Sequence, residues 1–154
     1  MTTEPARKIV ASNKRAFFDY EIIDRLEAGI VLRGPEIKSV RAGHVSINSS
    51  FAHVSNGEMW LANCYIQEYD KMAHETIDPR RSRKLLLHHR QIIRWKEKTA
   101  EKGFTIVPLH LYFTKNRLKL ELGLAKAKKT HDKRDAIKER DIKRETDRAI
   151  RRTI

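Results

Sequence analysis

The chain has 154 residues, a length that suits one domain with extensions. It carries 33 Lys and Arg against 20 Asp and Glu, which gives a formal net charge of +13. A surface this positive attracts polyanions: nucleic acid is the commonest such partner, and an anionic membrane is the runner-up. No run of about 18 apolar residues and no signal-peptide pattern is present, and the single cysteine excludes an intrachain disulfide. We therefore expect a cytoplasmic protein that does not bind membranes.

The N-terminal part predicts a loose arm, one long strand and one short helix. Residues 1–12 show no sustained period and are expected to form a flexible arm. Apolar residues at every second position predict a strand over 20–32 with one buried face. Pro35 then stands at the first position of a short helix, which Gly43 is expected to end.

Two hairpins are predicted further along the chain. Asn56-Gly57 tolerates the positive φ of a type I′ turn, and Lys115-Asn116 marks a second turn whose following strand alternates leucine with polar residues. Pro108 places the preceding strand at an edge or a bulge. The strands joined by these turns are predicted at 46–55 and 58–66, and at 105–113 and 118–124.

A polar surface loop is expected over 69–83, and a helix over 88–102. The three leucines at 85–87 fit either a strand or the start of the helix. Several short strands, two hairpins and inserted helices favour a mainly β fold. The leading candidate is an OB-like small antiparallel β-barrel over 13–124 with flanking helices, because closure hides strand edges and OB barrels bind nucleic acid.

The segment 125–154 changes composition abruptly. It lacks Gly, Pro and aromatic residues and holds 12 Lys and Arg against 6 Asp and Glu. Such a segment cannot build a core, so we expect a basic C-terminal tail that is disordered when free and helical on a highly negative surface such as ribosomal RNA. A permanently disordered tail that only raises nonspecific affinity stays as an alternative.

Motifs for catalysis, metals or cofactors are absent from the sequence, so we expect no catalytic residue, no metal, no cofactor and no enzymatic activity. A carboxylate pair formed by Glu27 and Glu36 leaves a metal-dependent nuclease as the weaker alternative. Cys64 is interpreted as a small core or strand residue.

Basic residues near aromatic ones point to RNA. Asn13-Lys14-Arg15 precedes three aromatic residues, and Lys38 and Arg41 share one face of the predicted helix. Lys and Arg neutralise phosphates, while exposed aromatic rings stack on unpaired bases. Each group alone also fits a merely solvated surface, but together with the net charge they favour RNA binding. A structural ribosomal or generic RNA-binding protein fits this pattern too.

Five motifs in fixed order carry a resemblance to a known family: N-K-R-A at 13–16, L-E-A-G at 26–29, G-P-E-I-K-S-V-R-A-G at 34–43, D-P-R-R-S-R-K-L-L-L at 78–87 and H-D-K-R at 131–134. From about Ile9 to Arg152 the chain resembles the SsrA-binding protein (SmpB, small protein B) family of bacteria. The resemblance implies an OB-like barrel that binds the tRNA-like domain of transfer-messenger RNA (tmRNA, SsrA RNA). It also implies delivery of that RNA to stalled ribosomes for trans-translation, and we expect the protein to act as a monomer.

The resemblance also implies site residues. Those tied to tmRNA binding are Asn13, Glu27, Leu86 and Lys119, to which we add Lys14, Arg15, Lys38 and Arg41. Glu27 either accepts hydrogen bonds from base edges or orients a neighbouring arginine, and Leu86 either touches RNA or packs under the site.

The tail motif is expected to engage the ribosome at the decoding centre, including its ribosomal RNA, inside the empty mRNA channel. Its residues are His131, Asp132, Lys133 and Arg134. Ala127 stands where the family commonly has a glycine, which predicts a stiffer joint between barrel and tail.

Overall fold

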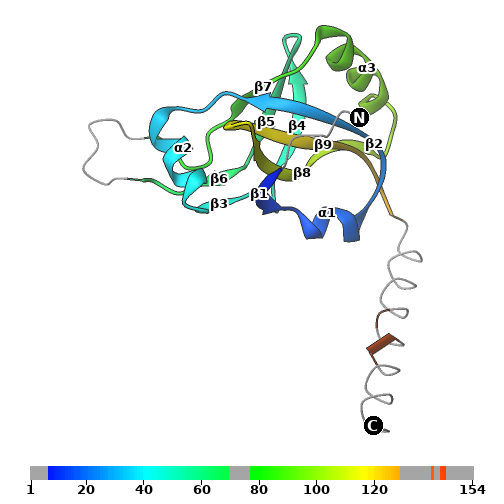
Figure 1. The fold of residues 1–154 in the computed structure, drawn as a ribbon. Coiled ribbons are helices and arrows are strands. Elements are labelled where there is room, and N and C mark those ends of the chain that lie inside the picture. Colours follow the sequence, from blue (N-terminus) through cyan, green and yellow to red (C-terminus); the bar gives the residue numbers. More distant parts are fainter. Residues whose placement is uncertain (1–6, 70–76, 129–139, 141–142, 145–154) are drawn as a thin grey trace, which may run out of the picture.

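The computed structural model describes residues 7–69, 77–128, 140 and 143–144, and strands make up most of its folded body (Figure 1). All strand pairings among these residues are antiparallel, which confirms the predicted mainly β class. The elements in chain order are β1 (Lys8–Ser12), α1 (Lys14–Asp19), β2 (Tyr20–Ile30), α2 (Gly34–Arg41), β3 (Val45–Ser46), β4 (Phe51–Ser55), β5 (Glu58–Ala62), β6 (Tyr65–Ile66), β7 (Arg83–Leu86), α3 (His89–Thr99), β8 (Phe104–Thr114) and β9 (Arg117–Ala127).

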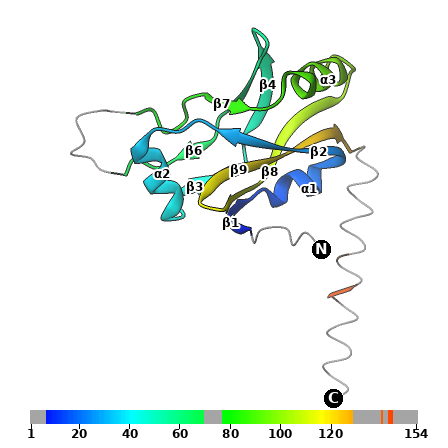
Figure 2. The ribbon, with the colours of Figure 1, turned by 45° about the horizontal axis from the view of Figure 1, so that its top comes forward.

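The main sheet closes on itself through its pairings. Its strand order is β1-β8-β4-β5-β7-β2-β9, and β9 also pairs with β8, so the circuit from β8 through β4, β5, β7, β2 and β9 returns to β8. Strands β3 and β6 form a separate two-stranded sheet. Figures 1 and 2 show α1, α2 and α3 on different sides of the strands. The OB-type assignment of this arrangement stays a prediction.

Both predicted hairpin turns are confirmed. Asn56 and Gly57 have φ values of 52° and 75°, and Lys115 and Asn116 have 49° and 61°. Two successive positive φ angles are the geometry of a type I′ turn, whose twist matches that of the strands it joins. The first hairpin is shorter than predicted, because the chain before Phe51 leaves the main sheet and contributes β3 instead.

The core lies inside the strand circuit, and the alternation in β9 explains it. Leu120, Leu122 and Leu124 are buried, as the sequence pattern predicts, and Ala28 of β2 packs with them. Trp95 of α3 adds the largest fully buried side chain. Other buried members of this cluster are Val40, Ile47, Ala52, Met59, Leu61, Cys64, Ile66, Leu85, Ile92, Ile106 and Leu111.

Two predicted boundaries of the folded body were wrong. The expected arm at 1–12 includes β1, which pairs with β8 and places Lys8 opposite Phe113. At the other end, β9 continues past residue 124 to Ala127, which pairs with Tyr20. Ala125 is fully buried and packs with Ala16 of α1, so the change in composition at residue 125 does not mark the end of the strand.

The remaining middle segments follow the prediction in part. The leucine run forms strand β7 and not a helix, and α3 ends at Thr99, whose hydroxyl donates to the carbonyl of Trp95 at 2.9 Å. Cys64 is buried in the core as expected, and burial raises the pKa of its thiol to about 11.

The predicted tail lies almost entirely outside the described residues, as do residues 1–6 of the predicted arm. Within the tail, Arg140, Lys143 and Arg144 are helical and exposed. The four decoding-centre candidates at 131–134 are outside the described residues. Nowhere in the described part of the chain is a helix both long enough and apolar enough to cross a membrane.

Candidate RNA interface

The register of the sheet places two of the predicted site residues, Leu86 and Lys119, in one row on its outer face. Leu86 of β7 pairs with Gly29 of β2, Gly29 with Lys119 of β9, Lys119 with Tyr112 of β8, and Tyr112 with Ile9 of β1. Side chains alternate between faces, and the neighbouring row points into the core, so this row points outward. The sheet thus brings together residues from five separate strands.

A second outer row lies two residues along β2, β9 and β8, and three residues along β1 because the register of β1 shifts between Ile9 and Ala11. Glu27 pairs with Glu121, Glu121 with His110, and His110 with Ser12, whose hydroxyl lies 3.0 Å from Nδ1 of the imidazole. We call the two rows, with the arginines that cover them, the sheet-face patch. Its members are Leu86, Lys119, Tyr112, Ile9, Glu27, Glu121, His110, Ser12, Arg7 and Arg25.

Leu86 lies on the surface of this patch. Its side chain is 53% exposed, so the alternative in which it packs under the site was wrong. Gly29 permits this position, because a Cβ at Gly29 would lie 3.2 Å from the Cβ of Leu86. This exposed leucine offers an apolar contact in the same row as Lys119, with Gly29 between them.

Glu27 contacts protein groups on the same face. Its carboxylate accepts a hydrogen bond from the hydroxyl of Tyr112 and lies 3.8 Å from Arg7. Glu121 accepts from Arg7 at 3.4 Å and from Arg25 at 3.1 Å. The acidic residues of the patch are therefore each matched by an arginine.

Asn13 is a structural residue at the edge of this face. It is buried, and its side chain caps α1 by accepting from the amide of Ala16 at 3.1 Å while donating to the carbonyl of Pro108 at 2.9 Å. The carbonyl of Pro108 lies where the register between β8 and β9 shifts before His110, which confirms the bulge alternative for this proline. Asn13 therefore fixes the start of α1 on β8.

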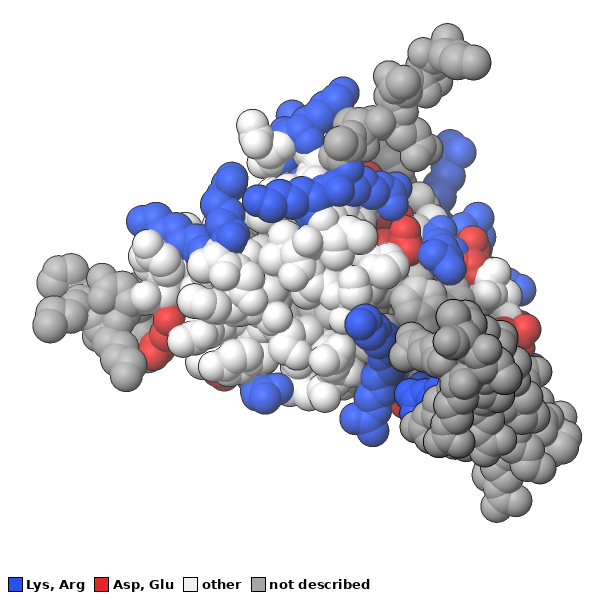
Figure 3. Space-filling model, turned by 60° about the horizontal axis from the view of Figure 1, so that its bottom comes forward, with Lys and Arg blue, Asp and Glu red and all other residues white. Residues whose placement is uncertain are grey.

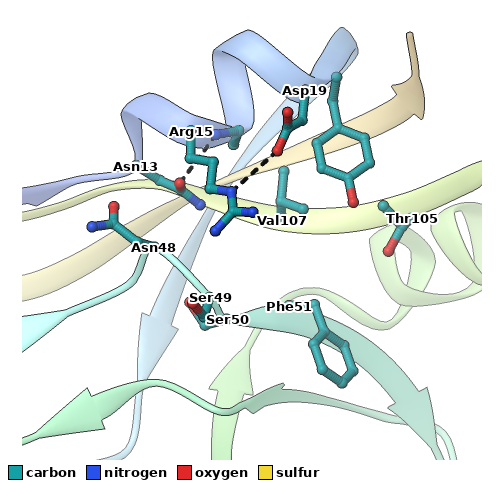
Figure 4. A pocket seen from close by; sticks show the side chains of 11 residues that line it. Asn13, Arg15, Asp19, Asn48, Ser49, Ser50, Phe51, Thr105 and Val107 are labelled. Atoms are coloured by element: carbon teal, nitrogen blue, oxygen red, sulfur yellow. Dashed lines mark hydrogen bonds and ion pairs between the residues drawn. The ribbon is translucent and has the colours of Figure 1, made fainter. Parts of the chain in front are cut away.

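This anchoring places Lys14 and Arg15 on the exposed side of α1. Arg15 pairs with Asp19 at 3.4 Å. In Figure 4 it extends over a cavity of about 470 Å³, across from Asn48 and Ser49 of the segment before β4. The first basic group predicted from sequence thus borders a polar hollow next to α1.

Lys38 and Arg41 lie on α2 with different aromatic partners. The Nζ of Lys38 is 5.5 Å from the ring centre of Tyr69, and the guanidinium of Arg41 is 4.8 Å from that of Phe113. Both side chains belong to exposed residues. They form a surface of cations over aromatic rings, and neither of them belongs to the sheet-face patch.

A buried ion-pair cluster holds α2 in place. The Nε of Arg83 donates to Glu36 at 2.7 Å, and Arg81 also donates to this carboxylate. Burial alone would raise the pKa of Glu36, but the hydrogen bonds from Arg81, the Arg33 amide and Arg83 outweigh it and lower the pKa. Arg83 is fully buried, so the expectation of a surface loop over 69–83 was wrong for this residue.

The carboxylate pair suggested for a nuclease was also wrong. Glu36 is held by Arg81 and Arg83, whereas Glu27 contacts Tyr112 and Arg7 on the sheet-face patch. The described residues contain no group of three or more His, Cys, Asp or Glu that is placed to hold a metal ion.

One face of the molecule shows how charge is arranged around the body. In Figure 3 Lys and Arg side chains border a broad region of uncharged side chains, and Asp and Glu are confined to a few places. Basic residues at the rim can hold phosphates while neutral groups contact sugars and bases. This pattern fits RNA, which presents both kinds of surface.

Sequence reasoning named Glu27, Leu86 and Lys119 of the sheet-face patch and missed its other seven residues, which are Arg7, Ile9, Ser12, Arg25, His110, Tyr112 and Glu121. Arg7, Ile9 and Ser12 fell in the expected arm, and the other four gain their neighbours only through pairing between distant strands. The β-branched pair Ile9-Val10 is the local signal that indicates the first strand.

Comparison with known proteins decides the family. The model of the family described as SmpB protein matches residues 10–152. The chain belongs to the SmpB protein family. It is 50% identical to the SsrA-binding protein of Carboxydothermus hydrogenoformans over 144 residues, which cover 94% of this chain and 97% of that protein. The SsrA-binding protein of Acidothermus cellulolyticus is 50% identical over 154 residues, with 100% and 97% covered.

A solved structure supports the same assignment. It is described as "tmRNA-SmpB: a journey to the center of the bacterial ribosome", and its matching chain is 46% identical. The TM-score is 0.67, with 82% of this chain and 92% of that chain covered. The family resemblance seen in the sequence motifs is thereby confirmed.

Proposed function

We propose that this protein is an RNA-binding adaptor that binds tmRNA and delivers it to stalled ribosomes for trans-translation. Membership of the SmpB family over residues 10–152 is the observation that carries this proposal. The solved relative described as tmRNA-SmpB supports tmRNA and the ribosome as partners. The net charge of +13 supplies the attraction to both RNAs.

On this proposal the sheet-face patch binds the tRNA-like domain of tmRNA. Lys119 contacts a phosphate, and Leu86 supplies an apolar contact to a base or sugar. Asn13 acts indirectly, because it is buried and fixes the helix that carries Lys14 and Arg15. Lys38 and Arg41 offer a further cationic surface on α2.

The tail has a separate role in this proposal. His131, Asp132, Lys133 and Arg134 engage the decoding centre, and the segment 125–154 becomes helical in the empty mRNA channel. Its excess of 12 basic over 6 acidic residues supports binding to ribosomal RNA. The protein acts in the cytoplasm, where ribosomes work, as a monomeric adaptor and not as an enzyme.

Sequencing the RNA that co-purifies with the full-length chain tests this function. We expect tmRNA to dominate the bound RNA. Recovery of ribosomal RNA fragments alone would favour a structural ribosomal protein instead. Affinity for tmRNA should fall steeply with salt, by about 0.7–0.9 log units per log unit of salt for each phosphate contact, and a flat response would contradict the electrostatic argument.

A further inference from the structure

The sheet-face patch holds two carboxylates at a place that is proposed to face RNA. Glu27 and Glu121 lie directly opposite each other in β2 and β9. Like charges in this position repel each other and destabilise a sheet, and both would repel phosphates. The groups that pair with these two carboxylates must therefore offset the repulsion.

Arginines occupy the space over these carboxylates. Nη2 of Arg7 lies 3.8 Å from Glu27, and Nη1 donates to Glu121 at 3.4 Å. Arg25 donates to the other carboxylate oxygen of Glu121 at 3.1 Å. One guanidinium therefore bridges the two carboxylates. Its positive charge offsets the repulsion between them, and the two carboxylates together hold Arg7 in place.

Tyr112 also holds Arg7 and Glu27 in place. Its ring centre lies 4.6 Å from the guanidinium carbon of Arg7, and its hydroxyl donates to Glu27. The residue is 1% exposed although it belongs to the outer row, so the groups above it cover it. Burial and the hydrogen bond to Glu27 raise the pKa of Tyr112 well above its ordinary value, so the phenol stays a donor at every physiological pH.

We propose that Arg7 is a phosphate-binding residue of the RNA interface and that Glu27 is a positioning residue that holds it over the sheet. The inference rests on the proposed function, because it requires this face to bind RNA. The side chain of Arg7 is 45% exposed, and its guanidinium has more N–H donors than its contacts with Glu27 and Glu121 use. A guanidinium held by stacking and ion pairs loses less conformational freedom on binding a phosphate than a solvated one.

Equilibrium binding of the full-length chain to the transcribed tRNA-like domain of tmRNA, over a series of salt concentrations, tests this assignment. Arg7→Ala should weaken binding about tenfold and lower the slope of log affinity against log salt by about 0.7–0.9. Lys96→Ala is the matched control, because it removes one exposed positive charge from α3, outside the patch. It should change both quantities much less.

Two further variants separate positioning from direct contact. Glu27→Gln keeps an acceptor for Tyr112 but removes the charge that attracts Arg7, so it should weaken binding in the wild type and have no further effect in Arg7→Ala. Arg7→Lys returns the charge without the planar fork, so it should restore the salt slope but only part of the affinity.

The possible failures are distinguishable. If the effects of Arg7→Ala and Glu27→Gln multiply, Glu27 contacts RNA itself and the positioning role is wrong. If Arg7→Ala matches Lys96→Ala in affinity and salt slope, Arg7 is no phosphate contact. A wild-type chain that does not bind the tRNA-like domain would contradict the proposed function itself.

Discussion

Replacing Glu36 by Gln removes the carboxylate that neutralises a buried guanidinium. Glu36 is 4% exposed and Arg83 is 0% exposed, and the two side chains are joined by a 2.7 Å hydrogen bond. After the change Arg83 keeps its hydrogen bonds to the carbonyls of Cys64 and Pro79, so its N–H groups stay largely satisfied. What is lost is the counter-charge of a group that cannot lose its proton.

The magnitude follows from this distinction. Removing one partner of a buried ion pair costs about 3–5 kcal/mol, because the other charge is left uncompensated. The retained hydrogen bonds of Arg83 place Glu36→Gln at the lower end, near 3 kcal/mol in the free energy of unfolding. Adding Arg83→Met to Glu36→Gln should recover part of this loss, since the uncompensated charge is then gone.

Urea denaturation of the full-length chain measures this effect. With a slope of about 1–3 kcal/mol per molar, the midpoint should fall by on the order of 1–3 M. Glu58→Gln is the control, because Glu58 pairs with Lys84 at 2.9 Å on the surface, where both side chains are more than two-fifths exposed. Its loss should stay below about 1 kcal/mol. Equal midpoints for the two variants would refute the claim that the buried pair anchors α2.

Three more outcomes follow from the packing and charges. Gly123→Ala would place a Cβ 3.0 Å from Cδ1 of the fully buried Leu109 and should lower the free energy of unfolding by about 1–3 kcal/mol, whereas Gly34→Ala meets no atom within 4 Å and should change it by less than about 0.5 kcal/mol in the same denaturation assay. Asn13→Ala removes the cap of α1 and should cost about 1–2 kcal/mol, of which Asn13→Ser recovers part by keeping an acceptor; equal losses would contradict the capping role. Because the pKa of Glu36 is lowered in the folded chain, its stabilisation is present above its ordinary pKa of 4.5 and is lost as pH falls through the lowered value, so an acid titration should show a steeper loss in the wild type than in Glu36→Gln.

A truncation tests the two-part design of the proposal. A chain that ends after Lys129 keeps all of β9, which ends at Ala127 and pairs with Tyr20, so the body should stay folded and tmRNA binding should stay nearly intact. Rescue of stalled ribosomes should disappear in a translation assay. Equal loss of binding and rescue would show that the two parts do not act separately.

Local patterns predicted the fold wherever the cause was local. The positive φ at Asn56 and Gly57 depends on what these two residues tolerate, so their dipeptide predicts the turn without knowledge of the rest. The alternation from Leu118 to Leu124 predicts which face of β9 is buried, because the period of a strand is two.

Non-local causes escaped the prediction. Strand β1 gains its hydrogen bonds from β8, about 100 residues later, and nothing within residues 8–12 announces that partner. Arg83 has the same local sequence signature as its basic neighbours, which are exposed or half-buried, and the carboxylate of Glu36 with the carbonyls of Cys64 and Pro79 explains why it is buried. The burial of an arginine can be predicted from sequence only when its acidic partner is known.

The residues of the candidate site were also predicted only in part. Glu27, Leu86 and Lys119 came from the family resemblance, and no periodicity marked them as neighbours. Their proximity arises from the registers of β7, β2 and β9, which are set by core packing. Arg7 and Tyr112 were missed for the same reason, since Arg7, just before β1, contacts β2 and β9, and Tyr112 of β8 contacts β2.

The same alternation that builds the core also fixes the recognition surface. In β9 a slip of one residue would turn Lys119 inward and expose Leu120, and each buried leucine contributes about 2 kcal/mol. Several leucines therefore oppose any register that disturbs the sheet-face patch. An RNA partner meets a preformed surface there, so the protein loses little conformational entropy when this surface binds RNA. On this proposal the larger loss of conformational entropy occurs in the tail, when it becomes helical on the ribosome. Affinity for tmRNA and binding to the ribosome can therefore change independently when one of the two parts is altered.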